Sequence, residues 1–126
     1  MKVLLINGSP DANGCVARAL REMESVFAAE GVEPQTMHVG NKPIRGCAAC
    51  GRCRELGRCV FNDAVNEAAA ALAEADGLVL GAPVYYAHAN GGLLAFADRL
   101  FYSAPFDKSM KVGAAVVSSR RAGSLY

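Results

Sequence analysis

Short apolar runs alternate with helix-forming segments along the whole chain, and this alternation restricts the fold more than any other feature. Apolar runs predict buried strands over residues 2–6, 77–83 and 111–118, and segment 34–39 predicts a less buried strand. The helical segments cover residues 15–31, 62–76 and 90–102. Strands that alternate with helices form parallel sheets, because right-handed crossovers place the helices on the two faces. The sequence therefore predicts a three-layer α/β sandwich around a parallel sheet.

The order of the strands predicts where a ligand binds. In open parallel sheets, ligands lie beyond the carboxyl ends of the strands, where the strand order reverses. For the order 2-1-3-4, this point lies between the first and third strands. The loops that meet there cover residues 7–15, 83–91 and 118–124, and they are rich in glycine, proline and serine. We therefore expect one binding site built from these three loops.

The composition excludes several classes of protein. A chain of 126 residues is the length of one domain, and its net charge of +1 excludes a polycation built for nucleic acid. The apolar run at residues 3–6 is too short for a signal peptide, and no stretch approaches the length of a membrane span. We therefore expect one cytoplasmic domain that binds neither nucleic acid nor membrane and keeps its thiols reduced.

The first loop has the features of an anion site. The segment NGSPDANGCV, residues 7–16, places the hydroxyl of Ser9 and the amides of a turn at the start of a helix. It matches neither the dinucleotide pattern G-x-G-x-x-G nor the nucleotide-binding pattern G-x4-G-K-[ST]. The segment predicts phosphate binding, and the alternative is an ordinary turn in which Asn13 caps the helix.

The second loop offers aromatic faces. Within APVYYAHANGG, residues 82–92, Pro83 ends a strand, and Tyr85 and Tyr86 offer flat faces and hydroxyls to a ring system. The alternative is that these tyrosines only cover the core. His88 is expected on the surface without a catalytic part. The chain shows no nucleophile–base pair and no paired carboxylates, so no side chain is expected to act as a catalyst.

Four of the five cysteines lie in one short segment with the spacing C-x2-C-x2-C-x5-C, and they are Cys47, Cys50, Cys53 and Cys59. Three sulfurs at three-residue spacing can turn toward one centre, as in the cluster-binding segment of bacterial ferredoxins. Here the last gap is five residues and Val60 follows, so all four could bind one 4Fe-4S cluster. Zinc and free or disulfide-linked thiols are the alternatives.

Several segments together resemble one family. The segments LLINGSPDANG, CAACGRCRELGRCVFND, EADGLVLGAPVYYAHANGGLLAFADRLF and SSRRAG resemble the NADPH-dependent FMN reductase-like branch of the flavodoxin-like superfamily, and within it the iron–sulfur flavoproteins. The resemblance implies a flavodoxin-like fold and an FMN-dependent oxidoreductase. It also implies electron transfer between a 4Fe-4S cluster and FMN, with NAD(P)H as a candidate donor.

The resemblance also implies roles for individual residues. The FMN phosphate would lie at the first loop, the isoalloxazine ring at the second and its pyrimidine edge at the third. The cofactor-binding residues implied are Ser9, Asn13, Gly14, Cys15, Val16, Pro83, Val84, Tyr85, Tyr86, Ala87, Ser118, Ser119, Arg120 and Gly123. The four clustered cysteines would hold the cluster, and Cys15 would not.

The chain departs from the family pattern in two respects near the phosphate. Asp11 stands where the family usually has a basic residue, and Cys15 and Val16 stand where it usually has Asn or Ser followed by Thr. Each change removes one charge-assisted bond to the phosphate, so each is expected to weaken FMN binding by about 1–3 kcal/mol.

The resemblance further implies one FMN-binding domain over residues 1–126, with a cysteine-rich loop at 45–60 and a truncated C-terminus. Family members continue with a fifth strand and last helices that this chain lacks. A sheet that ends at strand 111–118 has an apolar edge, which predicts a homodimer or homotetramer with residues 82–102 near the interface.

Two other functions remain open from the sequence. One is an NAD(P)H-dependent FMN or quinone reductase without a cluster, and the other is a non-catalytic thiol or metal-binding domain. For an oxidoreductase, the electron donor and acceptor are expected to be small molecules or proteins.

Overall fold

The central feature of the fold is a sheet of four parallel strands, seen in a computed structural model that describes residues 1–122. The strands have the order β2-β1-β3-β4, and their bounds are β1 Lys2–Asn7, β2 Glu33–His38, β3 Gly77–Pro83 and β4 Val112–Ser118. This confirms the predicted order 2-1-3-4. The order reverses between β1 and β3, so the carboxyl ends of these two strands mark the expected site.

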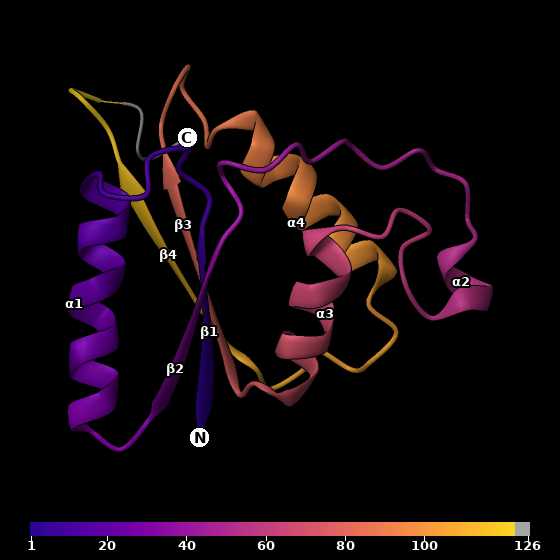
Figure 1. Cartoon of the computed structure of the whole chain (residues 1–126), viewed down its shortest axis with the longest axis horizontal. Coiled ribbons are helices and arrows are strands. Elements are labelled where there is room, and N and C mark those ends of the chain that lie inside the picture. The colour runs from indigo at the N-terminus through magenta and orange to yellow at the C-terminus, as the bar shows by residue number, and fades with distance from the viewer. Residues whose placement is uncertain (123–126) are drawn as a thin grey trace.

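Helices cover both faces of the sheet (Figure 1). The helix α1 Cys15–Ala29 lies against one face, and α3 Ala64–Glu74 and α4 Gly91–Ser103 lie against the other. The short helix α2 Cys53–Leu56 lies at the far end of the molecule, beyond α3 and α4. The result is the three-layer sandwich that the alternation of strands and helices predicts.

The central strand β1 divides the core into two parts. Its side chains alternate between the two faces, so Leu4 and Ile6 pack with α3 and α4. Val3 and Leu5 point the other way and pack with the apolar face of α1. All four side chains are buried, which explains why β1 has a continuous apolar sequence rather than an alternating one.

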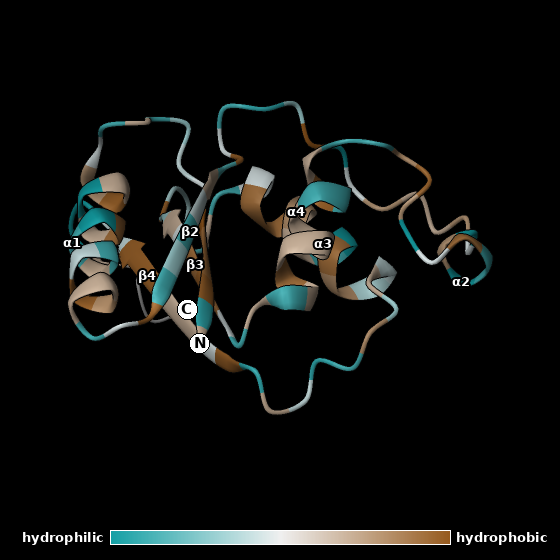
Figure 2. Cartoon of the chain, turned by 60° about the horizontal axis from the view of Figure 1, so that its bottom comes forward, coloured by the Kyte–Doolittle hydropathy of each residue, from teal (hydrophilic) through white to brown (hydrophobic). Residues whose placement is uncertain are grey.

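The two edge strands differ in polarity (Figure 2). Strand β2 is largely hydrophilic, whereas β4 is hydrophobic along its length. Val112 in β4 is 69% exposed and Val117 is 45% exposed, so part of this apolar strand faces solvent. Within residues 1–122, no further strand pairs with β4.

The cysteine-rich segment is more ordered than the sequence suggests. It contains the single helical turn of α2, in a part of the chain where neither a strand nor a helix was predicted. Gly57 ends α2 in the left-handed region, at φ 68°, where glycine has no steric cost. None of the helices in the described part of the chain is long and apolar enough to cross a membrane.

Candidate functional site

Three hydrogen bonds join the loops at the carboxyl ends of β1, β3 and β4. The amide of Gly8 donates to Gly81 O at 2.8 Å, and the side chain of Asn90 donates from Nδ2 to Gly8 O at 2.8 Å. The amide of Val84 donates to Ser118 O at 2.8 Å. The structure therefore brings together the three loops that the sequence selected as one site.

The loop after β1 is held firmly at Ser9. The amide of Ser9 donates to Asn7 Oδ1 at 3.0 Å, and the ring of His38 lies 2.7 Å from Ser9 O through Nε2. Gly40 passes so close that a Cβ atom there would lie 2.2 Å from Ser9 O, so only glycine fits. Buried Ser9 is thus placed by the ends of both β1 and β2.

The start of α1 carries no side-chain cap. The N-cap residue is Gly14, which cannot supply a cap, and the first turn holds no acidic residue. The alternative in which Asn13 caps this helix is therefore wrong. The first amides of a helix have no partner within the helix and lie at its positive end, so they favour an anion. This arrangement fits the phosphate group predicted for this loop.

Asp11 places a carboxylate inside the same loop. Its side chain accepts the amide of Asn13 at 2.8 Å through Oδ1, while its own amide donates to Ser9 Oγ at 3.2 Å. A Cβ atom on Gly14 would lie 3.1 Å from Asp11 Oδ2, so the carboxylate lies directly beside the start of α1. The loop therefore already contains one negative charge near the expected phosphate.

The tyrosines after β3 are open to solvent. Tyr85 is 62% exposed and Tyr86 is 87% exposed, so they do not cover the core. The turn that carries them is closed by a hydrogen bond from the amide of Tyr85 to His88 O at 3.3 Å, and Ala87 has a positive φ of 62°. His88 is exposed, which confirms its expected surface position. The two aromatic faces are thus available to a ligand.

The third loop is only partly described. Ser118 and Ser119 are half-buried beside the turn after β3, and Arg120 is exposed. Gly123, which was also predicted to bind the cofactor, lies outside the described residues.

Asn90 is a site residue that sequence reasoning missed. It is buried at the start of α4, where its amide donates to Pro83 O at 3.1 Å and its side chain holds Gly8. Among the described residues, its Oδ1 atom has no hydrogen-bond partner although it is buried. A buried acceptor without a partner is costly, so this oxygen is suited to a donor from a ligand. An asparagine directly before a helix was the available signal.

The four clustered cysteines line one hollow beside α4. The hollow has about 340 Å³ of empty space, its open mouth included. Cys47 and Cys50 are exposed, Cys53 is half-buried, Cys59 is buried, and all four thiols are free. Cys15 lies at the start of α1, on the opposite face of the sheet. The structure thus separates Cys15 from the other four, as the sequence predicts.

The cysteine sulfurs do not form a closed metal site. Within the part of the chain that the structure describes, no three His, Cys, Asp or Glu side chains lie close enough together to hold a metal ion. The donor set fits a cluster or a soft metal, because four cysteines line one hollow. The exposed part of the loop would have to close around the metal.

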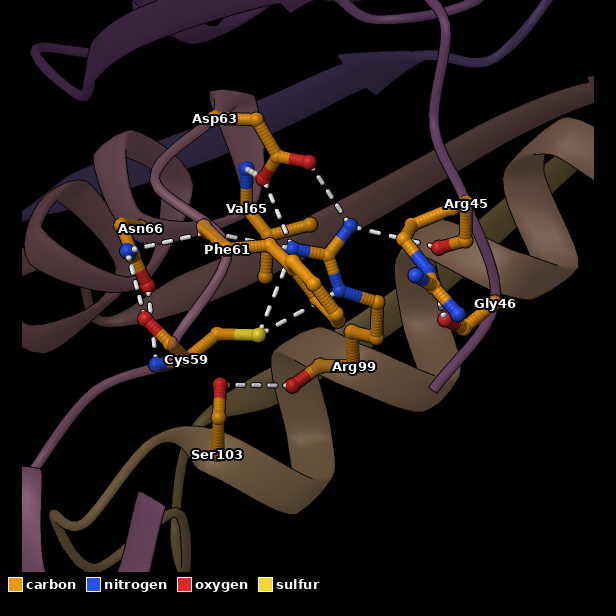
Figure 3. Close-up of polar contacts among 9 residues, drawn as sticks. All are labelled: Arg45, Gly46, Cys59, Phe61, Asp63, Val65, Asn66, Arg99 and Ser103. Atoms are coloured by element: carbon orange, nitrogen blue, oxygen red, sulfur yellow. Dashed lines mark hydrogen bonds and ion pairs between the residues drawn. The ribbon is translucent and has the colours of Figure 1, made fainter. Parts of the chain in front are cut away.

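A buried arginine, Arg99, is among the residues that line this hollow, and Figure 3 shows its polar contacts. Arg99 on α4 is 1% exposed and forms a two-point ion pair with Asp63, with N–O distances of 2.8 and 2.9 Å. It also donates to Cys59 Sγ from Nε at 3.4 Å and from Nη2 at 3.3 Å. Burial acts to lower the pKa of Arg99, but the hydrogen bonds and charges of Asp63 and Cys59 outweigh it and raise this pKa. The guanidinium therefore remains charged.

The local sequence explains how this pair forms. Arg99 lies on the same face of α4 as the buried residues Phe96 and Leu100, so the helix turns it inward. Asp63 is the N-cap of α3 and accepts the amide of Val65 at 3.1 Å. The capping role was predictable, but the pairing with Arg99 was not.

Comparison with known proteins gives consistent results. The sequence model of the family described as NADPH-dependent FMN reductase matches residues 1–125. An iron-sulfur flavoprotein of Methanocaldococcus jannaschii is 36% identical over 129 residues, which covers 98% of this chain and 65% of that protein. An iron-sulfur flavoprotein of Methanosarcina thermophila is 34% identical, covering 98% of this chain and 66% of that protein. The chain thus spans about two thirds of the length of these relatives.

Solved structures show the same fold. The apo form of NADH:FMN oxidoreductase (EMOB) is 25% identical with a TM-score of 0.65, covering 94% of this chain and 58% of that one. RosB with a bound flavin-phosphate intermediate is 13% identical with a TM-score of 0.76, covering 99% of this chain and 54% of that one. These matches confirm the α/β flavodoxin-like fold.

Proposed function

Because the chain belongs to the NADPH-dependent FMN reductase family, we propose that it binds FMN at the carboxyl ends of β1, β3 and β4 and acts as an FMN-dependent oxidoreductase. The observation that supports this most is the uncapped start of α1 beside buried Ser9, joined by hydrogen bonds to the loop after β3. When bound, the flavin supplies the electron-transfer chemistry, and the protein positions it.

Each loop has a proposed task. The first binds the phosphate with the Ser9 hydroxyl and the amides at the start of α1, and the second presents tyrosine faces to the ring. The third lies beside the ring's pyrimidine edge. The residues proposed are the cofactor-binding residues named in the sequence analysis, with Asn90 added because its free oxygen lies where the first two loops meet. We propose that residues 1–126 form one FMN-binding domain with a cysteine-rich loop at 45–60.

The cysteine hollow is proposed to hold a 4Fe-4S cluster that exchanges electrons with the flavin. The support is that all four thiols line one hollow and that relatives carry the name iron-sulfur flavoprotein. Helix α4 begins at the flavin loops and passes the hollow, and the nine residue steps from Asn90 to Arg99 span about 14 Å. NAD(P)H is the proposed donor, and a small molecule or protein is the acceptor.

Ligand titration tests the flavin proposal. The purified chain should bind FMN more tightly than riboflavin, because only FMN carries the phosphate that the start of α1 is suited to bind. FAD, which has no terminal monophosphate, should also bind less tightly than FMN. Equal affinities for FMN and riboflavin would show that the first loop does not bind the phosphate.

A second candidate is the same reductase without a cluster, and the open arrangement of the cysteine sulfurs favours it. Anaerobic reconstitution separates the two, followed by measurement of iron, sulfide, zinc and FMN per chain. Iron and sulfide with FMN support the cluster, FMN alone supports the plain reductase, and zinc or no cofactor supports a thiol or metal-binding domain.

A further inference from the structure

Both ends of the cysteine-rich loop meet on the guanidinium of Arg99 (Figure 3). At the start of the loop, Nη1 donates to Arg45 O at 3.2 Å. At its end, Nη2 donates to Phe61 O at 3.2 Å, and Nε and Nη2 both donate to Cys59 Sγ. One side chain on α4 therefore closes the loop at its neck.

Cys59 differs from the other three cysteines of the hollow. It is 9% exposed, and its backbone is held by Asn66, which accepts its amide at 3.0 Å and donates to its carbonyl at 3.0 Å. Cys47 and Cys50 are exposed, and Cys53 is half-buried. One thiol is thus fixed on the body of the domain, while the others lie on the open part of the loop.

The ion pair with Asp63 does not account for these contacts. Asp63 already balances the charge of Arg99 through two oxygens and is itself 27% exposed at the side chain. The remaining donations of the guanidinium all go to the loop, to one sulfur and two carbonyls. Hydrogen bonds from a charged donor are stronger than neutral ones, so this arrangement favours an electron-rich sulfur at Cys59.

We propose that Arg99 is a positioning residue that closes the cysteine-rich loop and fixes Cys59 as the preplaced ligand of the cysteine site. The second part of this inference rests on the proposed cluster. With a cluster bound, the two N–H donors would reach a ligand sulfur, and hydrogen bonds to cluster sulfurs raise the reduction potential. The other three thiols would then close on the metal from the open side.

The first test measures thiol labelling in the metal-free protein, with each cysteine read separately by mass spectrometry. In the unmodified protein, Cys59 should react most slowly of the four. Arg99→Gln should speed its labelling roughly tenfold or more, because the bonds that it loses hold the local structure closed. Labelling of Cys15, on the other face of the sheet, is the internal control and should not change.

A matched variant separates positioning from general stability. Asp63→Asn removes the ion pair but keeps a residue that caps helices well and leaves the donors to Cys59 in place. It should lower the melting temperature yet speed Cys59 labelling much less than Arg99→Gln does. Arg99→Lys keeps the positive charge but loses the branched set of N–H donors. Its Cys59 should be labelled at a rate between those of the other two variants. Equal acceleration in Asp63→Asn and Arg99→Gln, or none in either, would overturn the proposal.

The second test uses the reconstituted protein. Arg99→Gln should hold less iron per chain, and its remaining cluster should have a more negative midpoint potential than in the Asp63→Asn variant. If Arg99→Gln has the same iron content and midpoint potential as the unmodified protein, the proposed role of Arg99 at the cluster is overturned. If the unmodified protein takes up no iron, the cluster proposal fails by itself, and the labelling experiment still decides whether Arg99 fixes Cys59.

Discussion

Two charged residues, Asp11 and Arg99, lie at the two proposed binding sites. Arg99 is buried, neutralised by Asp63 and directed at a sulfur. Asp11, in contrast, places a negative charge inside a loop suited to an anion. Its carboxylate accepts a hydrogen bond from the amide of Asn13. The carboxylate thereby takes one amide of the loop, and a phosphate would have to compete with it.

Replacing Asp11 should strengthen FMN binding. Asp11→Asn keeps an oxygen that can accept the amide of Asn13 but removes the charge that repels the phosphate. Removing this repulsion is worth about 1–3 kcal/mol, which corresponds to a roughly 5- to 150-fold lower Kd for FMN by fluorescence titration. Riboflavin serves as the control, because it lacks the phosphate and should bind both proteins alike. If Asp11→Asn binds both ligands more tightly by the same factor, Asp11 acts on the loop and not on the phosphate.

At the scale of elements, the cysteine-rich loop and α4 form one functional unit. The loop supplies four thiols, and α4 supplies the guanidinium that holds its two ends. The same helix starts at Asn90, in contact with the loop after β1. A displacement of α4 would therefore disturb both proposed sites together.

The four cysteines of the hollow should act together. Replacing any one of Cys47, Cys50, Cys53 or Cys59 by serine should remove most of the iron from anaerobically reconstituted protein, because thiolate ligands share one cluster. FMN content should largely survive, since other loops bind it. Cys15→Ser is the matched control on the opposite face of the sheet. If this control loses as much iron as the others, the ligand assignment is wrong.

The sequence predicted the elements well because their signals are local. Strands β1, β3 and β4 are short apolar runs, α1 and α4 have a periodic apolar face, and α3 is rich in alanine. The single turn of α2 escaped because it is too short to show a period. The contacts of Arg99 with Asp63 and Cys59 were not predicted for another reason. They join residues far apart in the chain, and nothing in the spacing of either segment specifies the other.

At the scale of the whole molecule, the two edges of the sheet are unequal. The β2 edge is polar, while the β4 edge is apolar and partly exposed. Exposed apolar edge strands tend to pair with other chains. Tyr86 and Phe101 add exposed aromatic surface within residues 82–102, the region proposed to lie near such an interface.

Self-association should depend on β4 and not on β2. We expect a homodimer or homotetramer in sedimentation experiments, and Val112→Lys should shift it toward the monomer by placing a charge on the apolar edge. Gln35→Lys adds the same charge at an exposed position on the β2 edge, so it should leave the assembly unchanged. A protein that sediments as a monomer at high concentration would contradict the expectation. Equal dissociation by both variants would show that added charge, rather than the β4 edge, is responsible.

The closure of the cysteine-rich loop by Arg99 also bears on protein engineering. Segment 45–60 is short and continuous in the sequence, so it is a natural choice for transplantation into another α/β scaffold as a redox module. Its neck, however, is held by residues outside the segment, with Arg99 on α4 and Asn66 on α3. A graft of the loop alone would leave its ends free and Cys59 unanchored. A working transplant would need both helix residues, in two helices packed as α3 and α4 are here.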